Sequence, residues 1–349
     1  MAIRPAYARR RPERTTLYRV LLENIETLYS ASDEGALPFP LPHFVRKELD
    51  GYLDCGLLVR GFAHVACEHC ARSHLVAFSC KGRGFCPSCM GRRMAETAAN
   101  LIEYVLPPAP LRQWVLTLPY AWRKRVAYDG ALLGLLTRIF VKTVLAFYRK
   151  RIHRKGESGA VVVVQRTSSD LRLNPHLHIV FLDGVYRELG SEVVFEPLEH
   201  LATSEVGEVL EKACRRLERG LRRRGLLARE DEEEENPSGE LLAALAASAV
   251  AGTPPTGPTF LRKLPRLVSS KTSFEGKLCV QHGDFTLHAR TRAGAMDTKG
   301  REALLRYILR PIIAQERVTE GPEGLVRITL KRPFSDGTVA VDMDPLSLL

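Results

Sequence analysis

Apolar residues recur at three- and four-residue intervals near the start of the chain. Between residues 14 and 30 they fall at Leu17, Val20, Leu21, Ile25 and Leu28, a spacing that places them on one face of a helix. A proline-rich break at 36–42 separates this helix from a second one, predicted over 42–54. A third helix is predicted over 94–106, where two prolines end it.

Beyond residue 107 the pattern changes to that of a mixed sheet with helices. Strands are predicted over 111–118, 160–165, 176–182, 277–281, 285–290, 325–330 and 338–341, and helices over 129–153 and 299–310. The β-branched run at 160–165 predicts a buried strand, and Asp183-Gly184 predicts a turn. Thr298 is expected to cap the last helix. Together these elements predict an α+β fold.

The charge of the chain favours a polyanionic partner. The formal net charge is +11 and the sequence pI is about 9.4. Basic residues cluster at 9–11, 92–93, 123–125, 149–155 and 222–224. No run of 18 apolar residues and no signal peptide is visible, and no strongly apolar amphipathic stretch accompanies the basic clusters. We therefore expect a nucleic acid partner rather than a membrane.

Five of the eight cysteines fall between residues 67 and 89. Cys67-x-x-Cys70 and Cys86-x-x-Cys89 are two knuckles separated by fifteen residues, a spacing typical of a tetrahedral zinc site. A closed four-cysteine shell predicts a structural zinc ion. Alternatives stay open: the pairs could be redox pairs, or one cysteine could be replaced by Cys80 or by a histidine (His64, His69 or His74). Arg92 and Arg93, just after the second knuckle, are expected to bind DNA phosphates.

Three segments are expected from this organisation. A helical segment covers 1–58, a zinc-binding domain covers 59–106, and the remaining sheet and helices cover 107–349. Residues 185–260 resemble an insertion, with helices around 204–227, an acidic run at 231–235 and a Gly/Pro-rich stretch at 251–258.

His176-Leu177-His178 lies on a predicted strand. Because strand side chains alternate between faces, both imidazoles leave one face, while Leu177 enters the core on the other. Two imidazoles on a rigid strand can hold a divalent metal ion and leave coordination positions open for phosphate oxygens. Gln165, at the end of the neighbouring predicted strand, is a candidate third ligand. An incidental triplet and an exposed glutamine are the alternative interpretations.

Tyr307 lies in the last predicted helix, within the sequence LLRYILRP. A tyrosine between apolar residues is often only a core or rim residue. A phenol with a pKa near 10 attacks poorly unless a metal ion or a base assists it. The metal ion expected on His176 and His178 could give that help. Arg306 and Arg310 could then bind the flanking phosphates.

These pieces occur together in one order: CKGRGFCPSCMGRRMAETAA, RQWVLTLP, QRTSSDLRLNPHLHIVFLDGVY, RYILRPIIAQERV and LKRPFSDGT. In this combination the chain resembles the bacterial rolling-circle transposases founded on insertion sequence ninety-one. The resemblance extends over nearly the whole chain from about residue 17. It implies a transposase zinc-binding domain followed by an HUH endonuclease domain, an antiparallel sheet flanked by helices.

The resemblance also implies a reaction. His176 and His178 match the two histidines of the HUH motif, which hold Mg²⁺ or Mn²⁺. Tyr307 matches the nucleophile that nicks single-stranded DNA at the element terminus, forming a 5′-phosphotyrosine link and a free 3′-OH before strand transfer. A bacterial cytoplasmic protein, associated with the nucleoid through DNA, is expected.

One departure from the founding members concerns the second tyrosine. They carry a paired tyrosine four residues away, whereas residue 303 is Ala and residue 311 is Pro, so the chain resembles the single-tyrosine branch. An alternative function is that of a non-catalytic, zinc-dependent DNA-binding protein, a truncated or decayed transposase. An RNA-binding zinc protein is disfavoured because the aromatic residues are scattered along the chain.

Overall fold

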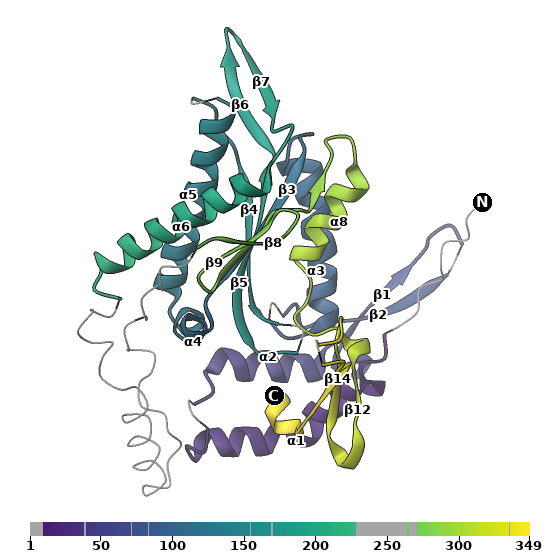
Figure 1. Cartoon of the computed structure of the whole chain (residues 1–349). Helices are drawn as coiled ribbons and strands as arrows, with labels where there is room; N and C mark the ends of the chain where they lie inside the picture. Colours follow the sequence, from purple (N-terminus) through teal and green to yellow (C-terminus); the bar gives the residue numbers. More distant parts are fainter. Residues whose placement is uncertain are drawn as a thin grey trace, which may run out of the picture. The chain divides into compact units, whose positions relative to one another are not determined.

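The chain folds into two compact units, each described here by itself. The computed structural model describes residues 10–37, 40–70, 72–82, 84–153, 155–168, 170–227, 264, 271–334 and 336–349 (Figure 1). Unit 1 comprises Met1–Glu96, Ser169–Leu171 and Arg310–Leu349, and unit 2 comprises Thr97–Ser168 and Arg172–Leu309. The C-terminal forty residues therefore belong with the N-terminal helices, unlike the expected division at residues 58 and 106.

Unit 1 combines helices from one end of the chain with strands from the other. Its elements are α1 (Thr16–Asp33), α2 (His43–Asp54), the hairpin β1 (Phe62–Ala66) and β2 (Ser73–Ala77), most of α3 (Pro87–Asn100), β12 (Val318–Glu320), β13 (Val326–Thr329), β14 (Ala340–Met343) and α9 (Pro345–Leu348). The apolar stripe of α1 packs with Tyr52 of α2 and with Val318 and Ile328 of the C-terminal sheet. This shared core explains why residues after 310 fold with the N-terminal part.

Unit 2 is built on an antiparallel sheet. The strand order is β4-β5-β3-β10-β9-β8, and β11 also pairs with β3. The strands are β3 (Leu111–Thr117), β4 (Ala160–Thr167), β5 (Leu173–Leu182), β8 (Ser273–Gly276), β9 (Cys279–His282), β10 (Phe285–His288) and β11 (Arg292–Ala293). The expected hairpin at 277–290 is present as β9 and β10, whose residues His282 and Phe285 pair directly across a two-residue turn.

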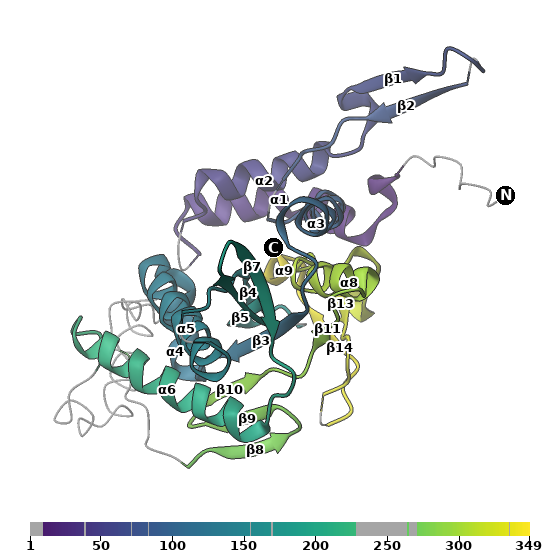
Figure 2. The same cartoon turned by 90° about the horizontal axis from the view of Figure 1, so that it is seen from above.

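Helices cover both faces of this sheet (Figure 2). On one face, α4 (Tyr120–Tyr128), α5 (Gly130–Arg151) and α6 (Thr203–Arg222) pack in a core that includes Leu177 and Ile179 of β5. On the other face, α8 (Thr298–Ile308) and the π-helix Leu101–Val105 pack near Val180 and Leu182. Alternate side chains of β5 therefore belong to two different hydrophobic clusters, one on each face of the sheet.

Helix α5 satisfies the length and composition of a membrane-spanning helix, and within the described residues no other helix does. Its residues Leu136, Phe140, Val144 and Tyr148 are fully buried in the core beneath the sheet. Burial inside a core accounts for its apolar composition.

Several local expectations needed correction. Strand β4 lies at the edge of the sheet, and none of its eight residues is fully buried, so the prediction of a buried strand at 160–165 was wrong. Asp297, not Thr298, caps α8 by accepting a hydrogen bond from the Gly300 N–H. The segment 185–227 forms β6 (Gly184–Leu189), β7 (Glu192–Pro197) and α6, and α6 belongs to the core. The acidic run at 231–235 lies outside the described residues.

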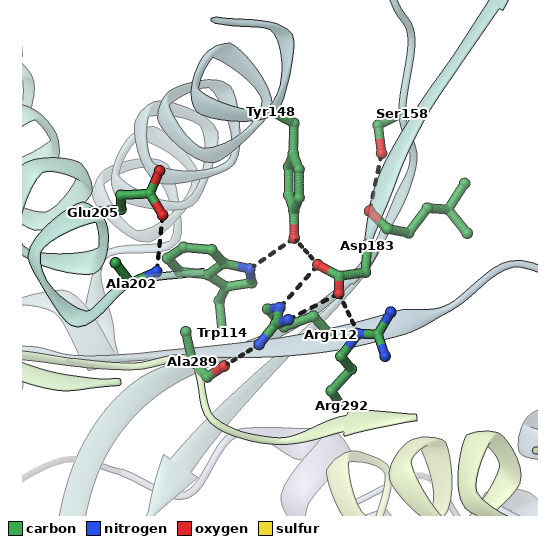
Figure 3. Close-up of polar contacts among 10 residues, drawn as sticks. Arg112, Trp114, Tyr148, Ser158, Asp183, Ala202, Glu205, Ala289 and Arg292 are labelled. Atoms are coloured by element: carbon green, nitrogen blue, oxygen red, sulfur yellow. Dashed lines mark hydrogen bonds and ion pairs between the residues drawn. The ribbon is translucent and has the colours of Figure 1, made fainter. Parts of the chain in front are cut away.

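Asp183 lies at the bend between β5 and β6, as expected of Asp183-Gly184, but its side chain has a second role that the sequence did not indicate. Its carboxylate is completely buried and is bound by Arg112 through Nε at 2.8 Å and Nη2 at 3.0 Å, by Arg292 Nε at 2.7 Å and by the Tyr148 hydroxyl at 3.0 Å (Figure 3). Burial, together with the Asp183 charge, raises the pKa of Tyr148 well above its ordinary value, so the phenol stays a donor. The next residue is glycine because a side chain at position 184 would collide with Glu196 and Phe195.

We predict that Asp183→Asn lowers the free energy of unfolding of unit 2 by about 3–5 kcal/mol, because it leaves Arg112 buried without its counter-charge. Urea unfolding followed by tryptophan fluorescence measures this unit specifically, since Trp114 and Trp122 are the two tryptophans of the chain and both lie in its core. The control is Glu218→Gln, which removes an exposed ion pair with Arg222 and should cost under about 0.5 kcal/mol. Equal effects of the two substitutions would contradict the prediction.

Candidate functional site

Four cysteine thiols gather in unit 1. Cys55 follows α2, Cys80 follows β2, and Cys86 and Cys89 lie at the start of α3. The sulfur–sulfur distances are 3.4 Å for Cys80–Cys89, 3.6 Å for Cys55–Cys89 and 3.7 Å for Cys86–Cys55. All four ligand atoms lie within 4.8 Å of one another.

This cluster fits a tetrahedral zinc ion. With Zn–S bonds of about 2.3 Å, the sulfur atoms of a tetrahedral shell are about 3.8 Å apart, close to the distances observed. Hydrogen bonds among the thiols lower the pKa of Cys55 and raise the pKa values of the donors Cys80 and Cys86, so without an ion the cluster shares its protons unequally. Hydrogen bonds from Cys55, Cys80 and Cys86 also lower the pKa of Cys89. Thiolates are the form in which cysteine binds a metal ion.

The ligand set differs from the predicted one in two positions. Cys67 and Cys70 are exposed at the tip of the β1–β2 hairpin, because the register Ala66↔Ser73 leaves both in the connecting loop. Cys55 and Cys80 take their places, so the prediction of Cys67 and Cys70 as ligands beside Cys86 and Cys89 was wrong. Cys80 was an open alternative, whereas Cys55 was missed. His64, His69 and His74 are exposed on the same hairpin and lie outside the cluster.

In unit 2, β5 brings the two histidines together on the face covered by α8. Their ring centroids lie 4.8 Å apart. Tyr307, near the end of α8, places its ring centroid 5.8 Å from that of His178 in an edge-to-face arrangement. His178 is 3% exposed, whereas Tyr307 is 47% exposed. The phenol therefore lies beside the histidine pair and also faces solvent.

Hydrogen bonds orient both imidazole rings. Nδ1 of His176 lies 2.6 Å from the carbonyl oxygen of Asn174. Since a carbonyl oxygen only accepts, this nitrogen carries the proton and Nε2 carries the lone pair. Nδ1 of His178 lies 2.7 Å from the side-chain amide of Gln113. A metal ion on Nε2 of His178 requires the amide oxygen of Gln113 to accept a proton from Nδ1, which rotation of the amide group allows.

Gln165 pairs with His176 in the β4–β5 register, so both side chains leave the same face. Its amide nitrogen donates to the carbonyl oxygen of Ile308 at 3.1 Å, connecting the edge strand to the end of α8. The amide oxygen is a suitable ligand for a hard divalent cation. Two imidazoles and one amide oxygen would then bind an ion on three sides and leave room for substrate oxygens.

The arginines predicted to bind phosphate lie in different places. Arg306 is exposed beside Tyr307 and forms an ion pair with Glu302 at 3.3 Å. Arg92 is exposed and Arg93 half-buried on the part of α3 that belongs to unit 1, and Arg310 also belongs to unit 1. Of the four, the structure brings only Arg306 into the same unit as the histidine pair.

Gln113 was missed at the sequence level. It is the second residue of RQWVLTL, a segment that was predicted only as a strand. The available signal was a polar residue at a buried strand position on the same face as the histidines, since Gln113 pairs with Val180 and is 3% exposed.

Two family models match the chain. The transposase zinc-binding domain matches residues 30–118 and a putative transposase model matches residues 159–349. The second match covers more than half of the chain and contains the histidine pair, Gln165 and Tyr307. The chain belongs to the transposases of the insertion sequence ninety-one type. No curated protein and no solved structure matches the transposase.

The zinc-binding match encloses all four clustered cysteines of the transposase. The cluster is accordingly a structural zinc site, held by Cys55, Cys80, Cys86 and Cys89. A closed thiolate shell leaves no position for substrate, and the ion would fasten α2 and β2 to the start of α3.

We predict that Cys55→Ser lowers the zinc content of the transposase at this site from one ion per chain to nearly none, because three thiolates cannot close the shell. Cys67→Ser, on the hairpin tip, should keep the ion. Metal analysis of the two purified variants after dialysis distinguishes these ligand sets. Loss of zinc in Cys67→Ser with retention in Cys55→Ser would reverse the assignment.

Proposed function

We propose that the transposase nicks a single DNA strand at the terminus of its element, with Tyr307 as the nucleophile. The observation that carries this proposal is the position of the Tyr307 ring beside His178, half-exposed on the face where both histidines emerge. A tyrosine that only filled the core would be covered like its neighbours Leu305 and Ile308. Exposure next to a candidate metal-binding pair suits a group that meets a phosphodiester.

The reaction is a transesterification. The Tyr307 oxygen attacks phosphorus, a new bond forms between tyrosine and phosphate, and the bond from phosphorus to the 3′ oxygen breaks. The proton leaves the phenol, and the departing 3′ oxygen gains one, so the products are a 5′-phosphotyrosine and a free 3′-OH. Because one phosphodiester replaces another, no co-reactant is consumed, and the link can later be transferred to a second strand.

His176, His178 and Gln165 would hold Mg²⁺ or Mn²⁺, which when bound supplies Lewis acidity at the scissile phosphate. Imidazole nitrogens bind Mn²⁺ more strongly than Mg²⁺, whereas an amide oxygen is a suitable ligand for both ions. Gln113 and the Asn174 carbonyl would keep the rings in the tautomers that leave Nε2 as the metal-binding atom. Arg306 is close in sequence to the nucleophile and could exchange Glu302 for a DNA phosphate.

Single-stranded DNA is the substrate that this site suits. A flexible single strand can bring a phosphodiester to the Tyr307 hydroxyl beside His178 more easily than a stiff duplex can. Tyr307 lies beside His178, and the positions four residues before and after it are Ala303 and Pro311. The proposal therefore includes one covalent strand per chain in rolling-circle transposition.

We predict that Tyr307→Phe abolishes a covalent adduct with an end-labelled single-stranded oligonucleotide from the element terminus. His176→Ala should reduce the adduct by at least about 100-fold, because the loss of a metal ligand removes transition-state stabilisation. Denaturing gel electrophoresis in the presence of Mn²⁺ measures the adduct. Tyr120→Phe is the matched control, an exposed tyrosine of the same unit, and should form the adduct normally.

The nicking proposal is refuted if folded wild-type protein forms no adduct but still binds the same DNA in a salt-sensitive way. That result would instead favour the non-catalytic, zinc-dependent DNA-binding protein. An adduct that persists in Tyr307→Phe would assign the nucleophile to another residue.

We predict that Gln113→Ala weakens Mn²⁺ binding by about 10- to 100-fold, because it removes the partner that orients His178. Electron paramagnetic resonance of Mn²⁺ measures the affinity independently of cleavage. Gln281→Ala is the control, a glutamine on β9 whose amide donates to the Gly283 carbonyl. Equal Mn²⁺ affinities in both variants would remove Gln113 from this role.

A further inference from the structure

A cationic groove runs between α5 and α6, on the face of the sheet opposite the histidine pair. Two cavities, of about 490 Å³ and 700 Å³, lie side by side along it and share Arg216 and Arg219. The separation of faces follows from β5, since Leu177 and Ile179 point toward α5 and α6 whereas His178 points toward α8. Figure 2 shows α5 and α6 on one side of the strands and α8 on the other.

Helix α6 supplies most of the charge. Lys212, Arg215, Arg216, Arg219 and Arg223 recur at three- and four-residue intervals and line the cavities. This spacing gathers them on one stripe of the helix. The stripe from Lys212 to Arg223 is about 16 Å long at 1.5 Å per residue.

Helix α5 faces this stripe with Lys142, Arg149 and Lys150. Against eight cations the two cavities contain two carboxylates, Glu208 and Glu211, and Glu211 accepts a hydrogen bond from Thr272 at 2.6 Å. The groove therefore has a large surplus of positive charge.

Within the described residues, few of these cations are neutralised by a carboxylate. Arg149 forms an ion pair with Glu157, and Arg216 donates to the Thr143 hydroxyl at 3.2 Å. In the described part of the chain, no carboxylate forms an ion pair with any of the other six: Lys142, Lys150, Lys212, Arg215, Arg219 and Arg223. Such a concentration of unneutralised cations repels itself unless a polyanion binds.

We propose that the α5–α6 groove binds the phosphate backbone of double-stranded DNA, independently of sequence. Each strand of a duplex presents a phosphate about every 3.4 Å along the axis, so the stripe on α6 matches about five phosphates. Binding of single strands usually adds stacking of bases on aromatic side chains. Here the cavities contain one aromatic residue, the half-buried Phe147. Charge without a stacking surface favours a duplex.

Duplex binding in the groove is a separate proposal from nicking, because the duplex would lie on the face of the sheet opposite Tyr307. It needs only that the transposase binds DNA. A strand at the histidine pair and a duplex at the groove could be bound at the same time, with the sheet of unit 2 between them.

The test is salt-dependent binding of a blunt 20-base-pair duplex that carries no element sequence, measured by fluorescence anisotropy with the full chain. The variant Arg215→Gln/Arg219→Gln/Arg223→Gln removes three exposed cations of the groove. We expect binding weaker by about 10- to 100-fold near 0.1 M salt, and a slope of log K against log salt smaller by about 2.7, which is 0.9 for each lost phosphate contact.

The control Lys124→Gln/Arg222→Gln/Arg224→Gln removes the same charge from positions outside the cavities, and we expect less than about a twofold change in duplex affinity. Unchanged duplex binding in the groove variant overturns the proposal, whether the groove then accepts an acidic protein segment or nothing. An equal loss in the control also overturns it, because the effect would then be one of net charge alone.

Cleavage of a short single-stranded oligonucleotide separates the two proposals. The groove variant should cleave it at the wild-type rate if both are right. Absence of cleavage in the wild type, with duplex binding lost only in the groove variant, would refute the nicking proposal and leave the groove supported.

Discussion

The buried Asp183 carboxylate binds β3 through Arg112 at the end of the β3–β5 ladder, and the candidate active site depends on the register of that ladder. Arg112, which binds Asp183, and Gln113, which contacts His178, are consecutive residues of β3. They therefore point to opposite faces of the sheet. A buried ion network on one face thus positions an amide on the other. A slip of one residue would exchange the two side chains and leave both Asp183 and His178 without their partners.

The zinc cluster and the histidine pair are built in different ways. The zinc cluster joins separate segments of unit 1, and its ligands come from a helix end, a strand end and the start of another helix. The histidine pair lies on one strand, whose geometry the sheet already fixes. An ion in the first site contributes to folding, whereas an ion in the second would meet a largely preformed set of ligands and so serve chemistry.

Periodicity was sufficient to predict most helices and strands, and the alternation along β5 predicted which face the histidines share. Periodicity does not predict which residues from separate segments come together in the fold. Cys55 lies outside any CxxC spacing, so only folding shows that it joins Cys89. Likewise, Asp183-Gly184 has the composition of a turn, but its surroundings make the aspartate a buried counter-ion. Local patterns describe single elements, whereas ligand sets and buried ion networks arise from the contacts between them.

The position of β4 at the edge of the sheet has a mechanical consequence. Strand β5 is paired on both sides, by β3 and β4, whereas β4 has one partner and an irregular register between Gln165 and Thr167. Backbone amides of such a border strand exchange with solvent more readily than those of interior strands. His176 and His178 therefore lie on an interior strand, whereas Gln165 lies on the edge strand. The proposed site could therefore open on the side of Gln165 while His176 and His178 stay in place.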